Sequence, residues 1–592
     1  MQSDPGVCRR PRDNAVTGRV GSYTESVAFS FHVEHFGCRA ARADGEAVSD
    51  RLRVAGLCEG EPSAADVVVV NTCSVTAEAD RAARAFIRRA HRLNPAARIV
   101  VTGCYAQRAP QELAGMAGVA AVVGNSHKAL TPEIVFELVQ GRGVEVLKGR
   151  GFSRAAETLP MGAALAAEGR QRNENDTPQG LKPESLLIAF DGSAKGAPFQ
   201  GNQIFTSTNS SSDFAGFIGV IKLIAGGGHA LAPIWADDSF AHSFLEEAQL
   251  VPGTQTRPNL KIQEGCGNRC SFCVIPQTRG FSRSLPAAAV LRQVEGFVAA
   301  GGKELVLSGI NLGRWGRDLA GSNSERMDRD LRFPTLSAEK RGKDGAPGLI
   351  GAPGPGPTLA ALVREIFAGT GLARLRLSSI EPMDWDADLI GLMAEFGGTR
   401  LARHAHLPLQ SGSDAVLRRM HRRYRPWHYA EKVEALVRAA GPELTLGADV
   451  MVGFPGETDG EFEETLELVR ALPFGYLHLF PFSPRPATRA WALHAERPVQ
   501  AAVVNERMAA LRALALEKSQ THRRCFVGRE LEAITLHTPA ALEARGRTEA
   551  LTENFLPVEL IGRLEPNRSV RVRVSGLTPE GALEAVPASN LL

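Results

Sequence analysis

Short runs of apolar residues recur along the first quarter of the chain, and each of them stops shortly before a cysteine. The runs and their cysteines are residues 27–36 with Cys38, residues 67–70 with Cys73, and residues 99–101 with Cys104. Residues 77–93 have the spacing of an amphipathic helix, and Thr76 is placed to cap it. Strands that alternate with helices predict a parallel sheet with helices on its faces. We assign this α/β domain to residues 27–141, after an N-terminal tail of residues 1–26.

Three cysteines therefore share one structural position. The carboxyl ends of parallel strands converge on one edge of a sheet, which is where ligands bind. We expect Cys38, Cys73 and Cys104 to meet there, although neighbours in this set are more than 30 residues apart. For a single cysteine, a small buried hydrophobe would be the simpler interpretation. Three cysteines in the same position favour a ligand site over chance.

Residues 257–524 show a second alternation of apolar strands and helices. The strands are residues 304–308, 375–379, 404–409, 445–452 and 476–482. Each is followed by polar or glycine residues, among them Glu381 and Gln410. Repeated polar endings predict a polar rim around the mouth of a full or partial β/α barrel, whose active site forms at the carboxyl ends of the strands.

Residues 525–592 predict a third, small domain. Residues 570–574 alternate strictly between valine and arginine, so the valines face inward and Arg571 and Arg573 face outward. Further strands are predicted at residues 531–535 and 555–561, and a turn at residues 546–548. A small antiparallel barrel of the oligonucleotide-binding kind fits these short strands. The two arginines alone indicate a solvated face as readily as an RNA contact.

Two stretches interrupt these patterns. Residues 142–256 are largely polar, rich in short side chains and without period, which is typical of a chain that buries too little apolar surface to order itself. Residues 319–357 are rich in glycine and proline, which predicts a flexible loop. We interpret both as insertions of little catalytic relevance.

The overall composition is that of an ordinary globular protein. The chain has 592 residues, 44% of them hydrophobic, and its net charge of +3 is too small to indicate nucleic-acid binding by itself. Its first residues lack the apolar core of a signal peptide, and no apolar run reaches the roughly 18 residues of a membrane span. Nine cysteines in so long a chain do not make a disulfide framework. We therefore expect a cytoplasmic protein with no membrane contact.

The strongest chemical signal is a loop of three cysteines at residues 261–276. Cys266, Cys270 and Cys273 have the spacing Cys-x3-Cys-x2-Cys, with Gly265 before the first. Iron–sulfur clusters normally take four cysteine ligands, so three leave one iron open to a small molecule. Zinc loops prefer pairs of Cys-x2-4-Cys with a second pair elsewhere, and the sequence has no such second pair. A zinc knuckle and three unrelated thiols are therefore the weaker interpretations.

This loop resembles that of the radical S-adenosylmethionine (SAM) enzymes, in which an aromatic residue precedes the last cysteine, as Phe272 does here. The resemblance implies a [4Fe–4S] cluster whose open iron chelates the amino and carboxylate groups of SAM, with Phe272 near the adenine. It also implies that the run Gly302-Lys303-Glu304 supports the methionine amino group. The candidate SAM contacts are Phe272, Gly302, Lys303, Glu304, Glu381 and Gln410.

The first domain resembles the amino-terminal domain of the methylthiotransferases, a family of radical SAM enzymes. The segments that carry the likeness are residues 37–46, 71–79 and 102–107. The resemblance implies that Cys38, Cys73 and Cys104 hold a second [4Fe–4S] cluster, which carries the sulfur to be inserted. The family usually has asparagine three residues after the first cysteine, and this chain has Ala41. The difference puts a neighbouring contact in doubt and leaves the ligand unchanged.

The whole resemblance implies a tRNA methylthiotransferase with two [4Fe–4S] clusters and SAM. Residues 74–79 are similar to the branch that inserts a methylthio group at C2 of N6-threonylcarbamoyladenosine, next to the anticodon. The last domain is similar to the TRAM module that docks RNA in this family. The implied partners are tRNA, a sulfur source and a reducing electron donor of the flavodoxin or ferredoxin type.

Other functions stay open from the sequence. Within the family, the alternative substrates are isopentenyladenosine in tRNA and an aspartate of a ribosomal protein. More distant alternatives are a radical SAM enzyme with only the central cluster, and an iron–sulfur protein that binds RNA without catalysis. Iron content distinguishes a radical SAM enzyme with one cluster from an enzyme with two. Formation of 5′-deoxyadenosine distinguishes an enzyme from an iron–sulfur protein that only binds RNA.

Overall fold

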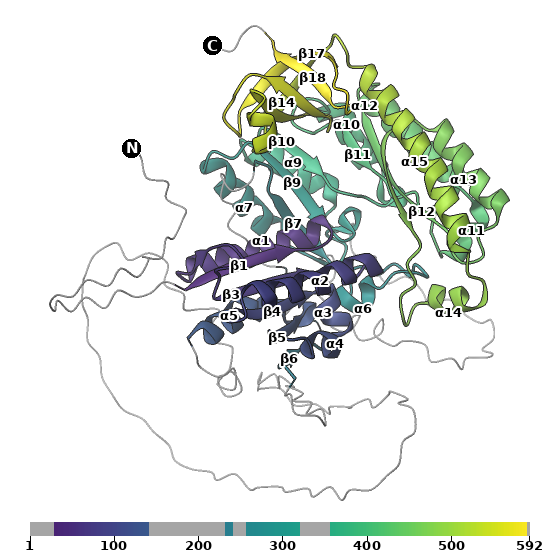
Figure 1. The fold of residues 1–592 in the computed structure, drawn as a ribbon. Coiled ribbons are helices and arrows are strands. Elements are labelled where there is room, and N and C mark those ends of the chain that lie inside the picture. The colour runs from purple at the N-terminus through teal and green to yellow at the C-terminus, as the bar shows by residue number, and fades with distance from the viewer. Residues whose placement is uncertain are drawn as a thin grey trace, which may run out of the picture. The chain divides into compact units, whose positions relative to one another are not determined.

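The computed structural model describes residues 29–140, 231–238, 240, 245, 256–319 and 356–588. These residues form a parallel α/β domain, a partial barrel and a small closed β-barrel, in this order along the chain (Figure 1). The predicted fold class is confirmed. The predicted tail of residues 1–26 and most of both predicted insertions lie outside the described residues.

The first domain is a six-stranded sheet whose strands are all parallel. The strand order is β2-β1-β3-β4-β5-β6, with β1 Ser30–His35, β2 Cys58–Glu59, β3 Val67–Thr72, β4 Arg98–Gly103, β5 Val119–Gly124 and β6 Ile234–Trp235. Every residue of β3 is buried, as expected for a parallel strand that is covered on both faces. The register of β3 with β1 and β4 brings the carboxyl ends of these three strands level.

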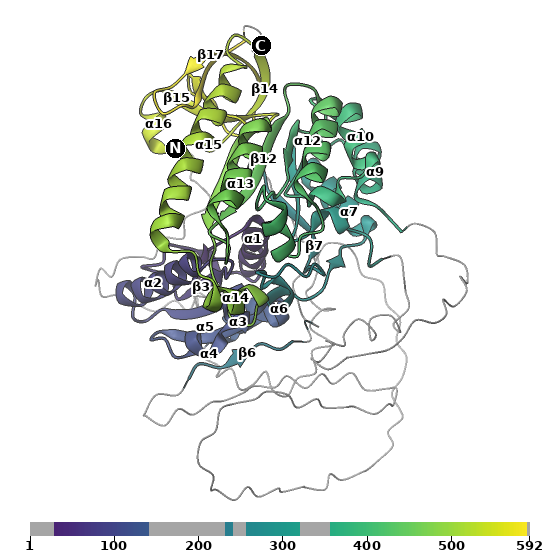
Figure 2. The same ribbon diagram turned by 90° about the vertical axis from the view of Figure 1, so that its right-hand side faces the viewer.

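Helices cover this sheet (Figures 1 and 2). They are α1 Arg39–Val54, α2 Ala77–Leu93, α3 Cys104–Arg108, α4 Pro110–Ala114, η1 Asn125–Leu130 and α5 Thr131–Val139. Side chains of α2, α3 and α4 share one hydrophobic core with β3 and β4, and α1 contacts α5. The predicted helix cap is confirmed, because the Thr76 hydroxyl accepts a hydrogen bond from the Ala79 amide at 3.2 Å.

The sixth strand comes from the segment that the sequence analysis assigned to an insertion. β6 pairs with β5 in parallel, Val122 with Ile234 and Val123 with Trp235. Part of residues 142–256 therefore belongs to the first domain, which differs from the prediction. A strand of two residues is too short for any periodicity to reveal it.

We expect Trp235→Ala to destabilise the first domain. The Trp235 side chain is 3% exposed at the edge of the sheet, and truncating a buried tryptophan costs about 3–5 kcal/mol. Trp427 is 51% exposed, so Trp427→Ala is the matched control and should change the free energy of unfolding by less than about 0.5 kcal/mol. Urea unfolding measures both variants. Equal midpoints would show that β6 adds nothing to stability.

The central domain is a partial barrel of six parallel strands, with the antiparallel strand β8 at one edge. One sheet has the order β10-β9-β7-β8 and the other β11-β12-β13. The bounds are β7 Asn259–Glu264, β8 Arg283–Ser284, β9 Glu304–Gly309, β10 Arg374–Leu377, β11 His404–His406, β12 Thr445–Val452 and β13 Phe474–Pro481. The two sheets meet where the Ala402 amide donates to the Leu375 carbonyl oxygen at 3.0 Å.

Side chains along the barrel strands alternate between two environments. Leu305 and Leu307 of β9 belong to the hydrophobic core between strands and helices, so Glu304 and Ser308 face the other side, the barrel interior. The helices are α6 Ile275–Arg279, α7 Ala287–Ala299, η4 Leu312–Arg314, α9 Leu359–Gly369, η5 Pro382–Asp384, α10 Ala387–Phe396, α11 Asp414–Arg419, α12 Pro426–Ala440, α13 Asp459–Ala471, α14 Arg489–Glu496 and α15 Ala501–Arg524. No helix in the described ranges combines the length and the apolarity needed to cross a membrane.

The third domain is a closed barrel of order β14-β15-β16-β18-β17, antiparallel except for the β16–β18 pair. Its elements are β14 Glu530–Thr535, α16 Ala540–Glu543, β15 Arg547–Thr552, β16 Pro557–Ile561, β17 Ser569–Leu577 and β18 Leu583–Pro587. The predicted turn at residues 546–548 covers the start of β15, a strand that the sequence pattern did not predict. Arg571 and Arg573 are exposed on β17, and they lie 3.9 and 2.6 Å from Glu532 and Glu530 of β14.

Candidate active site

The loop that carries Cys266, Cys270 and Cys273 follows β7 directly. Gly265 ends the strand with φ +72°, and a Cβ atom there would lie 2.0 Å from the carbonyl oxygen of Phe281. Only glycine fits this turn, because it has no Cβ and tolerates positive φ. The three cysteines therefore start at the carboxyl end of a barrel strand, which is the end at which such barrels bind ligands.

Each sulfur of this loop accepts a hydrogen bond. The pairs are the Asn268 amide with Cys266 Sγ at 3.4 Å, Arg422 Nη1 with Cys270 Sγ at 3.3 Å, and the Ile275 amide with Cys273 Sγ at 3.4 Å. Burial raises the pKa of Cys273 to about 12 and also raises the pKa of Cys266. Thiolates at these positions would need positive charge from a metal in addition to the hydrogen-bond donors.

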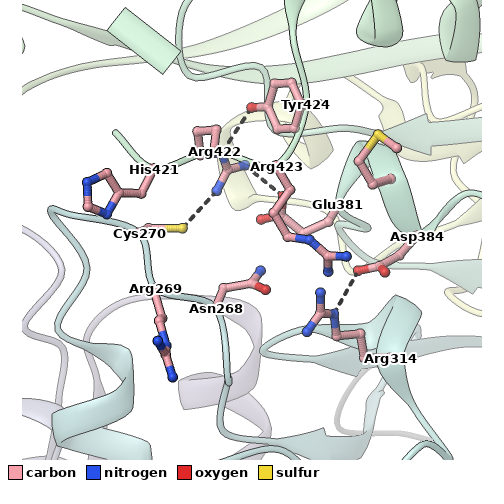
Figure 3. A pocket seen from close by; sticks show the side chains of 11 residues that line it. Asn268, Arg269, Cys270, Arg314, Glu381, Asp384, His421, Arg422, Arg423 and Tyr424 are labelled. Carbon is pink, nitrogen blue, oxygen red and sulfur yellow. Dashed lines mark hydrogen bonds and ion pairs between the residues drawn. The ribbon is translucent and has the colours of Figure 1, made fainter. Parts of the chain in front are cut away.

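A pocket opens beside Cys270 (Figure 3). Arg422 connects its parts, since Nη1 reaches Cys270 and Nη2 donates to Glu381 Oε2 at 2.7 Å. Arg314 Nε lies 3.4 Å from Asp384 Oδ2 on the wall formed by η4 and η5. The pocket thus presents charged groups of both signs, which suits a ligand with both an amino and a carboxylate group.

The other three cysteines lie together at the edge of the first sheet. Cys38 precedes α1, Cys73 follows β3, and Cys104 begins α3 directly after β4. Gly37 has φ +112°, and a Cβ atom there would lie 2.7 Å from Cys73 Sγ, so glycine lets the two segments approach closely. Burial raises the pKa of Cys73 to about 12, with further increases from the neighbouring thiols of Cys38 and Cys104.

Arg279 connects the two cysteine sites. It is the last residue of α6, six positions after Cys273, and is 1% exposed. Its Nε donates to Cys104 Sγ at 3.2 Å, and its Nη1 donates to Glu264 at 2.7 Å and to Asp44 at 3.2 Å. One side chain therefore links the helix after the loop cysteines to the second set of cysteines.

Two lysines complete a buried charge network, which consists of Asp44, Lys128, Lys261, Glu264 and Arg279. Lys128 Nζ donates to Asp44 at 2.9 Å, and Lys261 Nζ donates to Glu264 at 2.6 Å and also to Asp44. Burial opposes ionisation of Asp44, but Lys128, Lys261 and Arg279 outweigh it and hold its pKa well below the usual range. Three cations against two carboxylates leave one positive charge in excess beside Cys104, which favours an anionic ligand there.

We expect Asp44→Asn to unfold the first domain more easily. Breaking a buried ion pair by removing one partner costs about 3–5 kcal/mol, because the remaining charges stay buried. Glu46 lies on the same helix and pairs with Arg42, which is 59% exposed, at 2.9 Å; Glu46→Gln is therefore the control, with an expected cost below about 1 kcal/mol. Because the Asp44 pKa is depressed, its stabilising effect should be present at neutral pH and lost as the pH falls below the ordinary carboxyl range. Equal denaturant midpoints for both variants would contradict this.

The spacing of the thiols does not fit a single zinc ion. Within the described part of the chain, neither cysteine set has all three sulfurs within 4.8 Å of one another. A zinc ion, with Zn–S bonds of about 2.3 Å, would hold its thiolates closer than that. The described cysteines are therefore not arranged as a single zinc ion would hold them.

Several polar groups near the loop lack partners. Among the described residues, buried side-chain atoms with no hydrogen-bond partner include Asn268 Oδ1, Ser308 Oγ, Asn311 Oδ1, Ser378 Oγ and Gln410 Oε1. Asn311 also reaches the loop, because its Nδ2 lies 3.7 Å from Cys266 Sγ. Unpaired buried polar atoms are costly, so those on the loop and at the carboxyl ends of the barrel strands are candidate contacts for a polar ligand. Phe272, the aromatic residue of the loop, packs partly buried against the barrel core.

The structure contradicts the prediction that Gly302, Lys303 and Glu304 contact SAM. They lie at the amino end of β9, whereas the loop cysteines follow the carboxyl end of its parallel neighbour β7. A strand of six residues spans about 20 Å, so the two places are far apart. Glu304 is instead buried in an ion pair with Arg376. Ser308, near the carboxyl end of β9, is on the side where barrels bind their ligands.

A cluster of rings lines the barrel interior on β11, β12 and β13. His406 Nε2 and His478 Nδ1 lie 3.4 and 3.2 Å from Asp449 Oδ1. The ring centroid of Tyr476 lies 5.9 Å from that of His406 and 5.2 Å from that of His478. The Asp449 carboxylate lies close to both imidazoles, and the rings are tilted against one another by 24° to 54°.

Comparison with known proteins defines the class. Residues 30–124 match the model described as "Uncharacterized protein family UPF0004", and residues 260–469 match the radical SAM superfamily. These two regions contain all six cysteines of the two sites. The fold and the loop site are thus those of a radical SAM protein with an additional amino-terminal domain.

Relatives that match over most of the chain narrow this class. The chain is 29% identical over 542 residues to the threonylcarbamoyladenosine tRNA methylthiotransferase MtaB of Aquifex aeolicus (strain VF5), covering 91% of this chain and 99% of that one. It is 29% identical over 535 residues to the MtaB of Bacillus subtilis (strain 168), covering 90% of each. A tRNA-2-methylthio-N(6)-dimethylallyladenosine synthase of Cereibacter sphaeroides is 34% identical over 337 residues, covering 57% of this chain and 63% of that one. The chain belongs to the radical SAM methylthiotransferase family, as its sequence motifs predicted.

Proposed function

We propose that this chain inserts a methylthio group at C2 of N6-threonylcarbamoyladenosine in tRNA, next to the anticodon. The observation that carries the chemistry is the link through Arg279 between two sets of three cysteines, one at a barrel mouth and one on the first domain. The substrate assignment is supported by the MtaB relatives, which match about nine-tenths of the chain. Dimethylallyladenosine synthases also match, over 57% of the chain in one case and 92% in another. They are not favoured, because six MtaB relatives each match at least 90% of the chain.

In this proposal each cysteine set holds a [4Fe–4S] cluster. Cys266, Cys270 and Cys273 would leave one iron open for SAM, and the hydrogen bonds to their sulfurs fit that role. When bound, the cluster and SAM supply the one-electron chemistry that removes hydrogen from an unactivated ring carbon. The second set, Cys38, Cys73 and Cys104, lies beside the positive charge of Arg279, which suits an anionic cluster that carries sulfur.

The protein's own residues bind and orient the ligand at the barrel mouth and hold the first domain in place. Arg422 fixes Glu381 at the mouth, so the carboxylate has one position in which it meets the ligand. Unpaired polar atoms such as Gln410 Oε1 supply further contacts. The charge network holds the first domain against the barrel, since Lys261 and Arg279 of the barrel domain both donate to Asp44. The network thus fixes the distance between the cysteine set where the radical would form and the set that would donate sulfur. Both groups must be held close to the same carbon for the reaction to be fast.

The third domain is proposed to contact RNA as a TRAM-like module. Arg571 and Arg573 would bind phosphates, which position a nucleic acid without specifying its sequence. Their glutamate neighbours lower the net charge of this face, so the contact would be modest and salt-sensitive. A flavodoxin- or ferredoxin-type donor and a separate sulfur source complete the proposed set of partners.

Nucleoside mass spectrometry of tRNA tests the proposal. Cells that lack this gene should lose 2-methylthio-N6-threonylcarbamoyladenosine and accumulate the unthiolated nucleoside. Purified enzyme, given SAM, reductant and a sulfur source, should methylthiolate tRNA that carries threonylcarbamoyladenosine and leave isopentenyladenosine unchanged. Product only on the isopentenyl-bearing tRNA would refute the substrate assignment while leaving the chemistry intact.

A further inference from the structure

Arg39 directly follows Cys38 and is the first residue of α1. Its guanidinium lies over the ring of Phe555, with Cζ 5.5 Å from the ring centroid. The charged or polar groups near it include Tyr476 of β13, Arg376 of β10, His404 of β11 and Arg257. Residues of all three domains therefore meet beside Cys38, a cysteine of the second set.

Arg39 is exposed, and it also differs from the buried arginines in its partners. Each of the buried arginines Arg279, Arg374, Arg376, Arg422, Arg485 and Arg507 has a carboxylate within 4.0 Å. Within the described residues, no carboxylate lies within that distance of Arg39. Two guanidiniums thus share the Phe555 ring, and only that of Arg376 has a counter-ion, Glu304. An anion placed beside Arg39 would be bound favourably.

The backbone of Phe555, whose ring lies under Arg39, is strained. Phe555 has φ +69°, which is rare for an aromatic residue and costs of the order of 1 kcal/mol or more. The turn that presents it is tied down, because Asn554 Nδ2 donates to the Glu443 carbonyl oxygen at 3.0 Å and Arg376 donates to the Thr552 carbonyl oxygen at 2.7 Å. Because neighbouring residues hold Phe555 in this strained conformation, we infer that the position of its ring matters for function.

Other rings continue this surface into the barrel. The His404 ring centroid lies 4.3 Å from that of Phe555, and Tyr476 lies 5.7 Å from Phe555. His404 and Tyr476 stack at 5.9 Å with their planes 9° apart. The Phe555 ring is tilted by 35° against that of His404 and by 43° against that of Tyr476, so the three rings form an aromatic cluster and not a flat surface. Phe555 and Tyr476 are half-buried, and a base with an anionic substituent can contact such a ring and the neighbouring cation together.

The chemistry of the substrate places its anion near the sulfur donor. In N6-threonylcarbamoyladenosine, N1 lies between C2 and C6, and N6 is attached to C6, so C2 and N6 are on the same edge of the adenine. A base whose C2 faces Cys38, Cys73 and Cys104 therefore has its N6 substituent on the edge that faces the same cysteines. This substituent ends in a carboxylate. Arg39 is adjacent in sequence to Cys38, so a long side chain at this position reaches that region.

We propose that Arg39 binds the carboxylate of the threonylcarbamoyl group and that Phe555 positions its guanidinium. The proposal rests on the proposed function and deepens it, since it assigns the residue that selects this substrate. The same cation could otherwise bind a phosphate of the RNA backbone. The two anions differ in one testable respect, because only the carboxylate can be neutralised by esterification.

The test uses holoenzyme and two anticodon stem-loop RNAs, one with threonylcarbamoyladenosine and one with its methyl ester. Wild-type enzyme should favour the acid in kcat/KM and in dissociation constant, measured by mass spectrometry and fluorescence anisotropy. Arg39→Gln should lower kcat/KM for the acid about 10- to 100-fold, with little change for the ester. Arg39→Lys keeps the charge and should retain most of the preference, and Phe555→Leu should reduce it.

Arg42→Gln is the matched control, because Arg42 lies on the same helix and pairs with Glu46; it should keep the wild-type preference. Iron content of all variants should equal that of wild type. An unchanged acid-to-ester ratio in Arg39→Gln overturns the inference, and so does an equal loss on both RNAs, which would indicate a phosphate contact or a structural role. Failure of wild-type enzyme to thiolate the acid RNA at all would overturn the proposed function itself.

Discussion

Replacing Cys270 by alanine is expected to abolish formation of 5′-deoxyadenosine. Cys270 is one of three sulfurs in the barrel-mouth loop, and it is the one that lies beside the pocket and Arg422. A cluster with only two protein ligands is not held, so SAM has no iron to chelate. Chromatography of an anaerobic reaction with a strong reductant measures the loss, which should reach the detection limit.

Cys73→Ala should behave differently. Cys73 belongs to the other set of cysteines, so SAM cleavage should continue while methylthio insertion stops. Iron analysis supports the comparison, because wild type should hold about eight irons per chain and each variant about four. Cys525→Ala is the control, since Cys525 is exposed and in neither set. Thiolation of RNA by Cys73→Ala would refute the second site, and about four irons in wild type would favour a one-cluster enzyme.

The second large effect is expected for Arg422→Met. Arg422 is buried and donates both to Cys270 Sγ and to Glu381. The substitution leaves the Glu381 carboxylate without its cation beside the loop, which costs about 3–5 kcal/mol. We expect the rate of 5′-deoxyadenosine formation to fall about 100-fold. This corresponds to an increase of about 3 kcal/mol in the activation free energy.

A double variant separates stability from chemistry. Arg422→Met with Glu381→Gln removes both charges, so most of the lost stability should return while SAM cleavage stays slow. Arg418→Met is the control, because Arg418 is 60% exposed and pairs with Asp414 on the surface of α11. A wild-type cleavage rate in Arg422→Met would show that the ion pair has no part in the site.

The sequence predicted those parts of the fold that depend on local pattern. Residues 77–93 and 445–452 have the predicted bounds as α2 and β12, because each shows a clear period over many residues. β6 and β15 were missed, since one has two residues and the other follows glycine in a stretch that also suits a turn. Short elements take their conformation from neighbours that the local sequence does not show.

The candidate site divides in the same way. The short spacing of the loop cysteines along the chain is enough to predict their site. Glu304 was assigned to the wrong end of its strand, because a motif match does not show which end of a strand it occupies. Arg279 and Arg422 went unnoticed, since an arginine becomes informative only when its buried partners are known. The place of Arg279 at the end of the helix that follows the loop is the one signal that the sequence offered.

The two cysteine sets differ in how much chain separates their members, and this sets an order for maturation. Cys266 and Cys273 are seven residues apart, so the loop set already exists in a nascent chain. Cys38, Cys73 and Cys104 come together only after β1, β3 and β4 have paired. Arg279 then covers Cys104 when the barrel docks. Protein refolded without iron should therefore take up its metal in two kinetic phases, with the loop set filled first.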